Sequence, residues 1–275
     1  MSSDAPRRPQ VVAHRGASDE VAEHTMRAYR QALNDGADAL ECDVRLTRDG
    51  HLVCVHDRRL ERTSSGRGVV STKRLSDLQR LDWASWKHPW ADLDDEAELP
   101  DENAGALLTL RDLLDLVRNH PRPVGLLIET KHPTRYSGLV EQRLLELLAE
   151  YGWDRPAPDG APVRVRVLSY SQLSLRRMRV WAPAVPLAWV IHREIPVRVR
   201  RGELPRGVSD IAAECDLVRA NPAWVHRMHD SGHGVLVWTV NREEDIRMCR
   251  ELGVEAVITD RPRFAREILD ADPPP

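Results

Sequence analysis

The chain has 275 residues, of which 41% are hydrophobic and 30% are charged. This balance suits a folded protein with a core and excludes an intrinsically disordered chain. Its 40 basic and 43 acidic side chains leave a formal net charge of −3, so no overall positive field would attract nucleic acid or anionic lipid.

Targeting and redox signals are weak. No apolar run approaches the roughly 18 residues of a transmembrane helix. The N-terminus lacks the apolar segment of a secretory signal, so we expect a cytoplasmic protein without stable membrane insertion. The four cysteines are far apart and form no CxxC pair, which excludes a small disulfide scaffold and a zinc knuckle.

In chain order, short β-rich runs alternate with amphipathic helical segments. The predicted strands are Gln10–Ala13, Ala37–Leu46, His51–His56, Pro123–Glu129, Val163–Ser169, Pro186–Ile191, Cys215–Arg219, Val235–Val240 and Glu255–Thr259. The predicted helices are Thr25–Asp35, Leu110–Asn119, Gly138–Tyr151, Ser171–Trp181, Pro222–Ser231, Arg242–Leu252 and Pro262–Leu269. Such alternation predicts a parallel sheet with helices outside.

The second and third predicted strands must pair antiparallel, because only the turn Arg48–His51 separates them and a parallel crossover needs a dozen or more residues. Without this return strand, eight parallel strands remain, which is the number in a (β/α)8 TIM barrel. We therefore predict an α/β protein in which residues 1–275 form a single barrel domain with an early β-hairpin.

Residues 58–108 interrupt the alternation and are too many for an ordinary loop between a strand and a helix. This stretch has a glycine-rich turn, three tryptophans and an acidic run: Ser64–Gly68, Trp83, Trp86, Trp90 and Asp92–Glu98. We expect an insertion at the catalytic end of the barrel, where such loops carry function. The alternative is that these residues form a surface loop with no role in activity.

The first strand is followed by His14, Arg15 and Gly16. Residues at the carboxyl ends of barrel strands face the active site. Histidine transfers protons near neutral pH, and arginine presents a planar fork to phosphate oxygens. Glycine permits the tight turn that leaves the strand.

Glu41 and Asp43 lie two residues apart, so on a strand they share one face. A hard divalent cation is the natural partner of such a pair, although two solvent-facing acids are the alternative. A two-residue turn at Asp49–Gly50 would place Asp43 directly opposite His56. A turn one residue longer would move His56 to the other face of the hairpin. The observed register therefore tests whether His56 lies opposite Asp43.

Another apolar run ends in Glu129 and Lys131, which also share one face. Glu129 would add a third carboxylate, and three carboxylates suit Mg²⁺ or Ca²⁺. Lys131 is one of only three lysines and would balance a phosphate. Trp238 would either contact a small polyol or belong to the core. Asp260 would cap the last helix, with a proline in the first turn.

These residues resemble the glycerophosphodiester phosphodiesterase family. The matching segments, in family order, are His14–Gly16, Glu23–Thr25, Glu41–Asp43, His56–Asp57, Arg62–Gly68, Glu129–Lys131, Ser169–Tyr170, Trp238–Asn241 and Thr259–Pro262. Two segments depart from the family pattern, since His24 stands where an asparagine is usual and Tyr170 where a phenylalanine is usual.

The resemblance implies a TIM barrel that uses one divalent cation to hydrolyse small-molecule glycerophosphodiesters to glycerol 3-phosphate and an alcohol. It implies that the metal ligands are Glu41, Asp43 and Glu129. It also implies that His14 and His56 are the acid–base pair, and that the substrate or its phosphate is contacted by Arg15, Lys131 and Trp238. The attacking group is water or a hydroxyl of the substrate. The alternatives are a related barrel phospholipase, of the phosphatidylinositol or sphingomyelinase D type, and a non-catalytic binding module.

Overall fold

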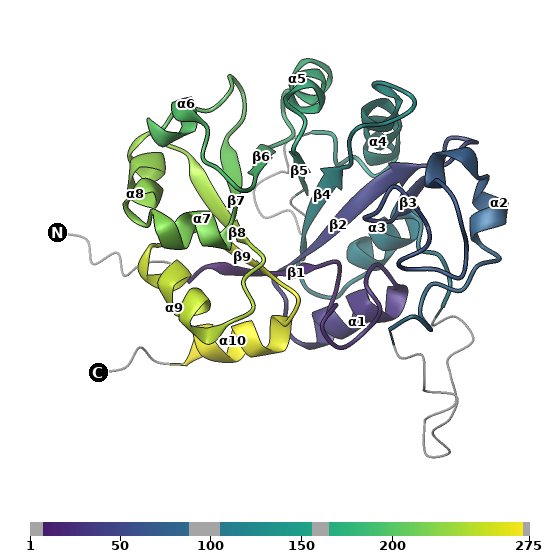
Figure 1. Ribbon diagram of the computed structural model, residues 1–275, viewed down its shortest axis with the longest axis horizontal. Helices are drawn as coiled ribbons and strands as arrows, with labels where there is room; N and C mark the ends of the chain where they lie inside the picture. Colours follow the sequence, from purple (N-terminus) through teal and green to yellow (C-terminus); the bar gives the residue numbers. More distant parts are fainter. Residues whose placement is uncertain (1–7, 88–104, 156–164, 272–275) are drawn as a thin grey trace.

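Eight parallel strands close into a barrel in the computed structural model, which describes residues 8–87, 105–155 and 165–271 (Figure 1). Strand β1 pairs with both β9 and β2, so the first and last strands are neighbours and the ring is complete. The predicted TIM barrel is confirmed. The strands are β1 Gln10–His14, β2 Ala39–Leu46, β4 Gly125–Thr130, β5 Val165–Ser169, β6 Leu187–Ile191, β7 Asp210–Glu214, β8 Gly234–Trp238 and β9 Ala256–Thr259.

Helices surround the barrel, as Figure 1 shows. The main helices are α1 Met26–Asn34, α3 Leu110–Arg118, α4 Leu139–Glu150, α5 Gln172–Trp181, α8 Ala223–Asp230, α9 Glu243–Glu251 and α10 Pro262–Asp270. All seven match a predicted helix to within one residue at each end. Shorter helical segments that were not predicted are η1 Val70–Thr72, α2 Leu75–Leu78, α6 Val197–Arg200 and α7 Cys215–Ala220. No helix in the described ranges is both long enough and apolar enough to cross a bilayer.

The predicted strand Cys215–Arg219 is wrong, because this segment belongs to helix α7. The seventh strand is β7, whose residues Ile211, Ala212 and Ala213 are fully buried. A short apolar run has no periodicity that separates a strand from a buried helical turn. In α7 the buried pair Cys215 and Val218 has the three-residue spacing of one helix face.

The hairpin after β2 has a longer turn than predicted. Its return strand, β3 (Leu52–Cys54), pairs antiparallel with β2, and Val44 lies opposite Cys54. Thr47 and His51 close a three-residue loop through a 2.9 Å hydrogen bond from the Thr47 N–H to the His51 carbonyl. The loop ends at Gly50, whose φ of +88° favours glycine.

The extra loop residue shifts the register, so the predicted pairing of Asp43 with His56 is wrong. Asp43 instead lies opposite Val55, whose N–H donates to the Asp43 carbonyl at 3.0 Å. His56 follows the end of β3 and is therefore free of the alternation of side chains that the strand imposes. Its position depends on the loop that begins there.

The barrel interior is filled by a cluster of small and aliphatic side chains. Ala39 and Leu127 are members of this cluster and lie on the inward faces of β2 and β4. Going up those faces, the next inward positions are Glu41 and Asp43 on β2 and Glu129 on β4. The apolar filling therefore ends where a layer of acidic side chains begins, at the carboxyl ends of the strands.

The insertion after β3 has a small core of its own. Trp83, 5% exposed, packs in it with Val53 and Val55 of the hairpin region, and its indole N–H donates to the Leu78 carbonyl. Trp83 is thus a packing residue. Trp90 and the acidic run Asp92–Glu98 lie outside the described residues.

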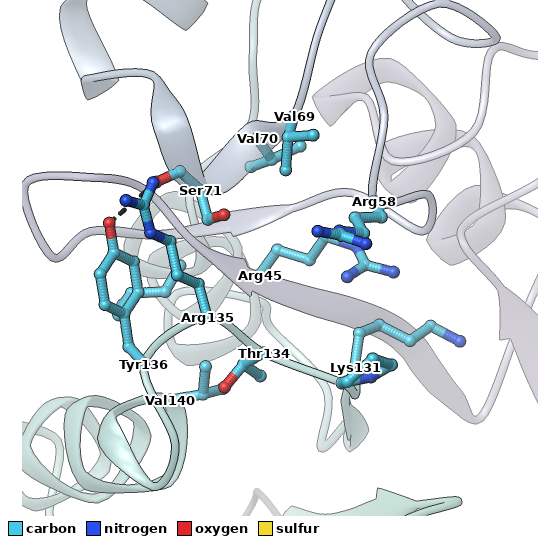
Figure 2. A pocket seen from close by; sticks show the side chains of 12 residues that line it. Arg45, Arg58, Val69, Val70, Ser71, Lys131, Thr134, Arg135, Tyr136 and Val140 are labelled. Carbon is cyan, nitrogen blue, oxygen red and sulfur yellow. Dashed lines mark hydrogen bonds between the residues drawn. The ribbon is translucent and has the colours of Figure 1, made fainter.

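The insertion and the segment after β4 form the walls of a pocket, which we call the distal pocket (Figure 2). The hydroxyl of Tyr136 donates to the Ser71 carbonyl at 2.9 Å and joins the two walls. The distal pocket is lined by Arg45, Arg58, Lys131, Arg135, Val140 and neighbouring residues.

Candidate active site

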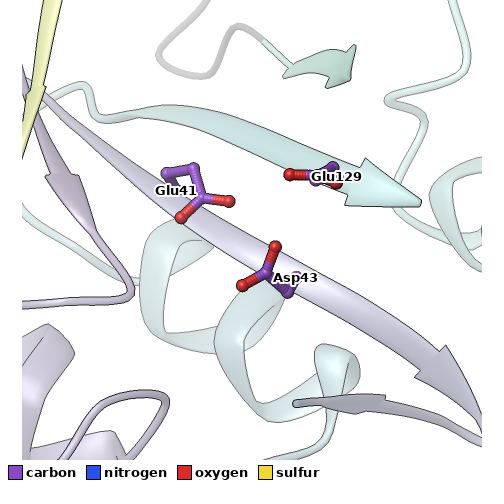
Figure 3. Close-up of side chains that lie close together, drawn as sticks. All are labelled: Glu41, Asp43 and Glu129. Atoms are coloured by element: carbon purple, nitrogen blue, oxygen red, sulfur yellow. The ribbon is translucent and has the colours of Figure 1, made fainter. Parts of the chain in front are cut away.

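Three carboxylates meet at the carboxyl end of the barrel. Glu41 and Asp43 come from β2, and Glu129 lies beside Asp43 on the paired strand β4. One oxygen of each lies within 4.8 Å of the others, and the side chains converge in Figure 3. All three residues are buried, with exposed fractions of 3%, 1% and 7%.

Two cations contact these carboxylates. The Lys131 ammonium lies 2.8 Å from Asp43 Oδ1 and 2.8 Å from Glu129 Oε1. The Arg15 guanidinium lies 3.0 Å from Asp43 Oδ2, and the backbone N–H of Arg15 donates to Glu41 Oε2 at 3.2 Å. The cluster therefore has one more acidic group than these two side chains neutralise.

The pKa values reflect this imbalance. Burial, reinforced by the charge of Asp43, raises the pKa of Glu41 well above its usual value. Burial raises the pKa of Glu129 to about 7, against the opposing attraction of Lys131. Burial also disfavours the Asp43 anion, but Lys131 and Arg15 outweigh it and lower that pKa. A buried set of three carboxylates that favours additional positive charge fits a hard divalent cation such as Mg²⁺ or Ca²⁺.

The turn after β1 directs Arg15 into this cluster. Arg15 has a φ of +61° and Gly16 a φ of +89°, both in the left-handed region. A Cβ atom on Gly16 would lie 2.6 Å from the carbonyl carbon of Ala28 in α1, so only glycine fits against the helix. The left-handed backbone and the close helix together position the arginine.

His14 is held by a carboxylate from the far end of the chain. Its Nδ1 lies 2.7 Å from Asp260 Oδ1, which also accepts from the Ser18 hydroxyl at 2.8 Å. The other Asp260 oxygen accepts from the Asn241 amide at 2.7 Å. Burial disfavours the Asp260 anion, but the bonds from His14, Asn241 and Ser18 outweigh it and lower the pKa to about 2.

The predicted helix-capping role of Asp260 is wrong. The residue in the N-cap position of α10 is Arg261, and the Asp260 carboxylate contacts His14 instead. Pro262 does occupy the first turn, as predicted. A carboxylate that bonds the Nδ1 of a histidine fixes the ring and leaves Nε2 available. Asp260 therefore holds the His14 ring, and Ser18 and Asn241 hold Asp260. The sequence did not indicate these contacts, although Asp260 and Asn241 lie in two of the matching segments.

His56 is also bonded to a carboxylate, in this case its neighbour in sequence. Its Nδ1 lies 2.7 Å from Asp57 Oδ1. Arg62 donates to Asp57 at 2.6 Å and to both oxygens of Glu23 at 2.7 Å. Glu23 in turn lies 3.1 Å from Arg15, so a chain of ion pairs joins the insertion to the acidic cluster.

His56 lines a cavity of about 430 Å³ together with Glu129, Lys131 and Tyr170. We call this the catalytic cavity. Burial lowers the pKa of His56 to about 4, against the attraction of Asp43. Although the strand register differs from the prediction, the structure brings His56 to the same cavity as Glu129 and Lys131.

His24 is a further residue at the acidic cluster. Its Nε2 lies 2.9 Å from Asp43 Oδ2 and its Nδ1 lies 2.8 Å from the Tyr29 hydroxyl, which donates to the Glu41 carbonyl. One indication of this contact was present in the sequence, the unusual histidine in the segment Glu23–Thr25. His24 contacts the same carboxylate, Asp43, as Arg15 and Lys131 do.

Trp238 stands at the end of β8. Its indole N–H donates to the Ala212 carbonyl at 3.1 Å, and the side chain packs against the cluster inside the barrel. The Tyr170 ring meets it edge to face at 6.0 Å and lies 5.8 Å from the Lys131 ammonium. The partly buried tryptophan therefore lies against the barrel filling and beside Tyr170.

Comparison with known proteins gives one consistent family. The sequence profile of the "Glycerophosphoryl diester phosphodiesterase family" matches residues 14–264. The chain is 42% identical to the "Probable glycerophosphodiester phosphodiesterase 1" of Mycobacterium tuberculosis over 274 residues, 95% of this chain and 93% of the relative. It is 31% identical to the glycerophosphodiester phosphodiesterase of Bacillus subtilis, covering 96% of this chain and 87% of the relative.

The fold is similar to that of solved structures. An Oleispira antarctica phosphodiesterase, solved in complex with the product sn-glycerol-3-phosphate, superposes with a TM-score of 0.79. The two sequences are 23% identical, and the match covers 96% of this chain and 97% of the other. A glycerophosphodiester phosphodiesterase from Agrobacterium tumefaciens gives a TM-score of 0.74 at 22% identity, over 96% of this chain and 100% of the other.

Proposed function

The chain belongs to the glycerophosphoryl diester phosphodiesterase family, and on that basis we propose that it hydrolyses glycerophosphodiesters to glycerol 3-phosphate and an alcohol. One observation carries the proposal. Three buried carboxylates, two cations and two histidine–carboxylate pairs are grouped at the carboxyl end of one barrel. This combination suits an anionic substrate whose reaction needs both charge neutralisation and proton transfer.

Glu41, Asp43 and Glu129 are the residues that would hold a divalent cation, Mg²⁺ or Ca²⁺. Such an ion would offset the negative charge of the phosphoryl oxygens. The buried position of the three carboxylates supports this role, because the surplus of acid there is costly unless a cation balances it.

Arg15 and Lys131 would bind the phosphate. Both side chains are largely buried, and their charges act in surroundings where electrostatic attraction is stronger than in water. Both contact Asp43, and Lys131 also lines the catalytic cavity. Trp238 would limit the space beside the phosphate and contact the glycerol carbons.

His14 and His56 would transfer the protons. One imidazole accepts the proton of the attacking oxygen, and the other donates a proton to the departing alkoxide. In each ring, Nδ1 is bonded to a carboxylate, so Nε2 is the atom that exchanges the proton. General acid–base catalysis typically contributes about 10²–10⁴-fold.

The test is release of glycerol 3-phosphate from glycerophosphocholine by the purified protein. We expect turnover with Mg²⁺ or Ca²⁺, loss on chelation, and recovery when the ion is restored. Glu41→Ala should abolish metal-dependent turnover and weaken metal binding in calorimetry, because a buried ligand is gone. The matched control is Glu146→Ala, which removes an exposed acid of α4.

Two results would count against the proposal. One is an unchanged rate after chelation together with normal turnover by Glu41→Ala. The other is cleavage of diacyl phosphatidylinositol but of no deacylated diester, which would assign the protein to the related barrel phospholipases.

A further inference from the structure

The distal pocket adjoins the catalytic cavity. It has a volume of about 180 Å³ and shares Arg45, Arg58 and Lys131 with the catalytic cavity. We propose that it binds a second anionic group, carried by the leaving alcohol, so that the enzyme favours glycerophosphodiesters whose leaving alcohol is itself phosphorylated. This inference rests on the proposed function.

Three arginines of the pocket form no ion pair with any residue that the structure describes. Arg45, Arg58 and Arg135 line it, and none of them has a carboxylate within ion-pair distance in the described part of the chain. Nearby Arg59 and Arg62 differ, since each is paired with a carboxylate. Within the described ranges, the three pocket arginines therefore give this space more positive than negative side chains.

Arg45 is oriented by hydrogen bonds to a neutral group. Its guanidinium donates two hydrogen bonds to the neutral His56 carbonyl, at 2.7 and 2.9 Å. Figure 2 shows the Arg45 and Arg58 guanidinium groups together at one side of the pocket and Arg135 at the other. Like charges brought together without a counter-ion favour an anion between them.

The rest of the lining suits a short carbon skeleton. Val69, Val70 and Val140 supply apolar surface, and the Tyr136–Ser71 hydrogen bond fixes the two walls. A phosphorylated polyol would contact the valines with its carbons and the arginines with its phosphate. A cationic head group such as choline would be repelled.

The position of Lys131 indicates how one substrate would reach both spaces. Its ammonium contacts Asp43 and Glu129 on the catalytic side, and the residue also lines the distal pocket. With the scissile phosphate at Arg15 and Lys131, a leaving group that extends past Lys131 enters the distal pocket. The two cavities would then bind the two phosphates of one molecule.

The experiment compares three substrates that share the glycerophosphate part. Their leaving alcohols are choline, glycerol and glycerol phosphate, which are cationic, neutral and anionic. We expect kcat/KM for the phosphorylated substrate to exceed that for glycerophosphoglycerol by about tenfold, as one charge-assisted contact would provide. Glycerophosphocholine should be the poorest of the three.

Arg135 provides the test variants, because it lines the distal pocket and contacts no proposed catalytic group. Arg135→Gln should lower the preference for the phosphorylated substrate by about threefold, and Arg135→Glu should abolish it, since one charge is removed or reversed. Both should retain turnover of glycerophosphoglycerol. Arg247→Glu, at a half-buried arginine of α9 far along the chain from the pocket residues, changes the net charge equally and should retain the preference.

Several outcomes would overturn the inference. Equal kcat/KM for the phosphorylated and neutral substrates in the wild type would do so, as would a preference that Arg135→Glu leaves intact. A pocket that binds only free inorganic phosphate would show Arg135-dependent phosphate effects on glycerophosphocholine turnover without substrate preference. If the wild type cleaved none of the three substrates, the proposed function itself would fail.

Discussion

The two histidines beside the acidic cluster are held by different parts of the molecule. His14 stands at the end of β1 and bonds Asp260, which lies 246 positions later in the chain. His56 stands in the loop after β3 and bonds Asp57, the next residue. The His14 side chain is 15% exposed and the His56 side chain 34%.

The barrel therefore fixes the position of the His14 ring, whereas a loop fixes the position of the His56 ring. The Asp260 carboxylate has two further partners, Ser18 and Asn241, so it has little freedom to turn. The Asp57 carboxylate depends on Arg62, which is 42% exposed and also binds Glu23. We infer that one imidazole is positioned rigidly, whereas the position of the other depends on the insertion.

The largest expected effect is loss of either imidazole. His14→Ala and His56→Ala should each lower kcat by about 10²–10⁴-fold, because one proton transfer loses its catalyst. Steady-state assays and circular dichroism would show whether activity falls while the fold remains. Added imidazole should rescue His56→Ala better than His14→Ala, since the His56 site is more open.

His120→Ala, which removes a histidine of the loop after α3, is the control. Near-normal turnover by either test variant would contradict the acid–base assignment. Equal rescue by imidazole would leave that assignment standing and would break the distinction between the two sites.

The next effect concerns the carboxylates that hold the rings. Asp260→Asn should lower kcat on the order of 10²-fold, because the amide cannot keep the same bonds to His14, Ser18 and Asn241. Asp57→Asn should lower kcat by only about tenfold, because the residues around Asp57 can rearrange. Rates measured at saturating substrate would test this order, and a larger loss in Asp57→Asn would reverse the comparison.

The Asp260 carboxylate should also affect stability at low pH. Its folded pKa of about 2 lies below the ordinary value near 4, so it stabilises the fold above pH 4 and loses that effect as pH falls toward 2. The contribution is at most about 2.5 kcal/mol. Urea unfolding from pH 6 to pH 2 should show that the difference in unfolding free energy between the wild type and Asp260→Asn becomes smaller as the pH falls.

The matched control for this pH series is Asp216→Asn, which changes an acid whose side chain is 75% exposed. Its difference from the wild type should vary less with pH. A gap for Asp260→Asn that stays constant down to pH 2 would contradict the assigned ion pair.

The smallest effect is expected at Arg62. Arg62→Gln should cost about 1 kcal/mol of unfolding free energy, because ion pairs of partly exposed side chains contribute little. Its effect on kcat should be non-additive with Asp57→Asn and additive with Asp260→Asn, because, of these two aspartates, Asp57 bonds Arg62 and Asp260 does not. Double-mutant cycles would test this, and coupling between Arg62 and Asp260 would contradict it.

The comparison also explains what could be predicted from the sequence. The barrel and its main helices could be predicted because each helix or strand carries its own periodicity. Glu41, Asp43 and Glu129 could be placed together because inward-facing positions alternate along adjacent strands. These are local rules, and they hold for residues inside regular elements.

The errors lie where a local rule does not apply. The pairing of Asp43 with His56 depended on a two-residue turn, and one extra residue at Arg48–Gly50 changed it. Asp260 matched a helix cap in sequence, but its partner His14 lies at the other end of the chain, and no local pattern predicts that contact. The prediction of a strand at Cys215–Arg219 was wrong because a short apolar run fits both a strand and a buried helical turn.

The pairing of β1 with β9 has a consequence for synthesis of the protein. A nascent chain that has left the ribosome only as far as β8 has no last strand to lie against β1. It also lacks Asp260, so His14 has no acceptor for its ring. The enzyme should therefore remain inactive during translation until its final strand emerges, and then gain barrel closure and a complete site in one event.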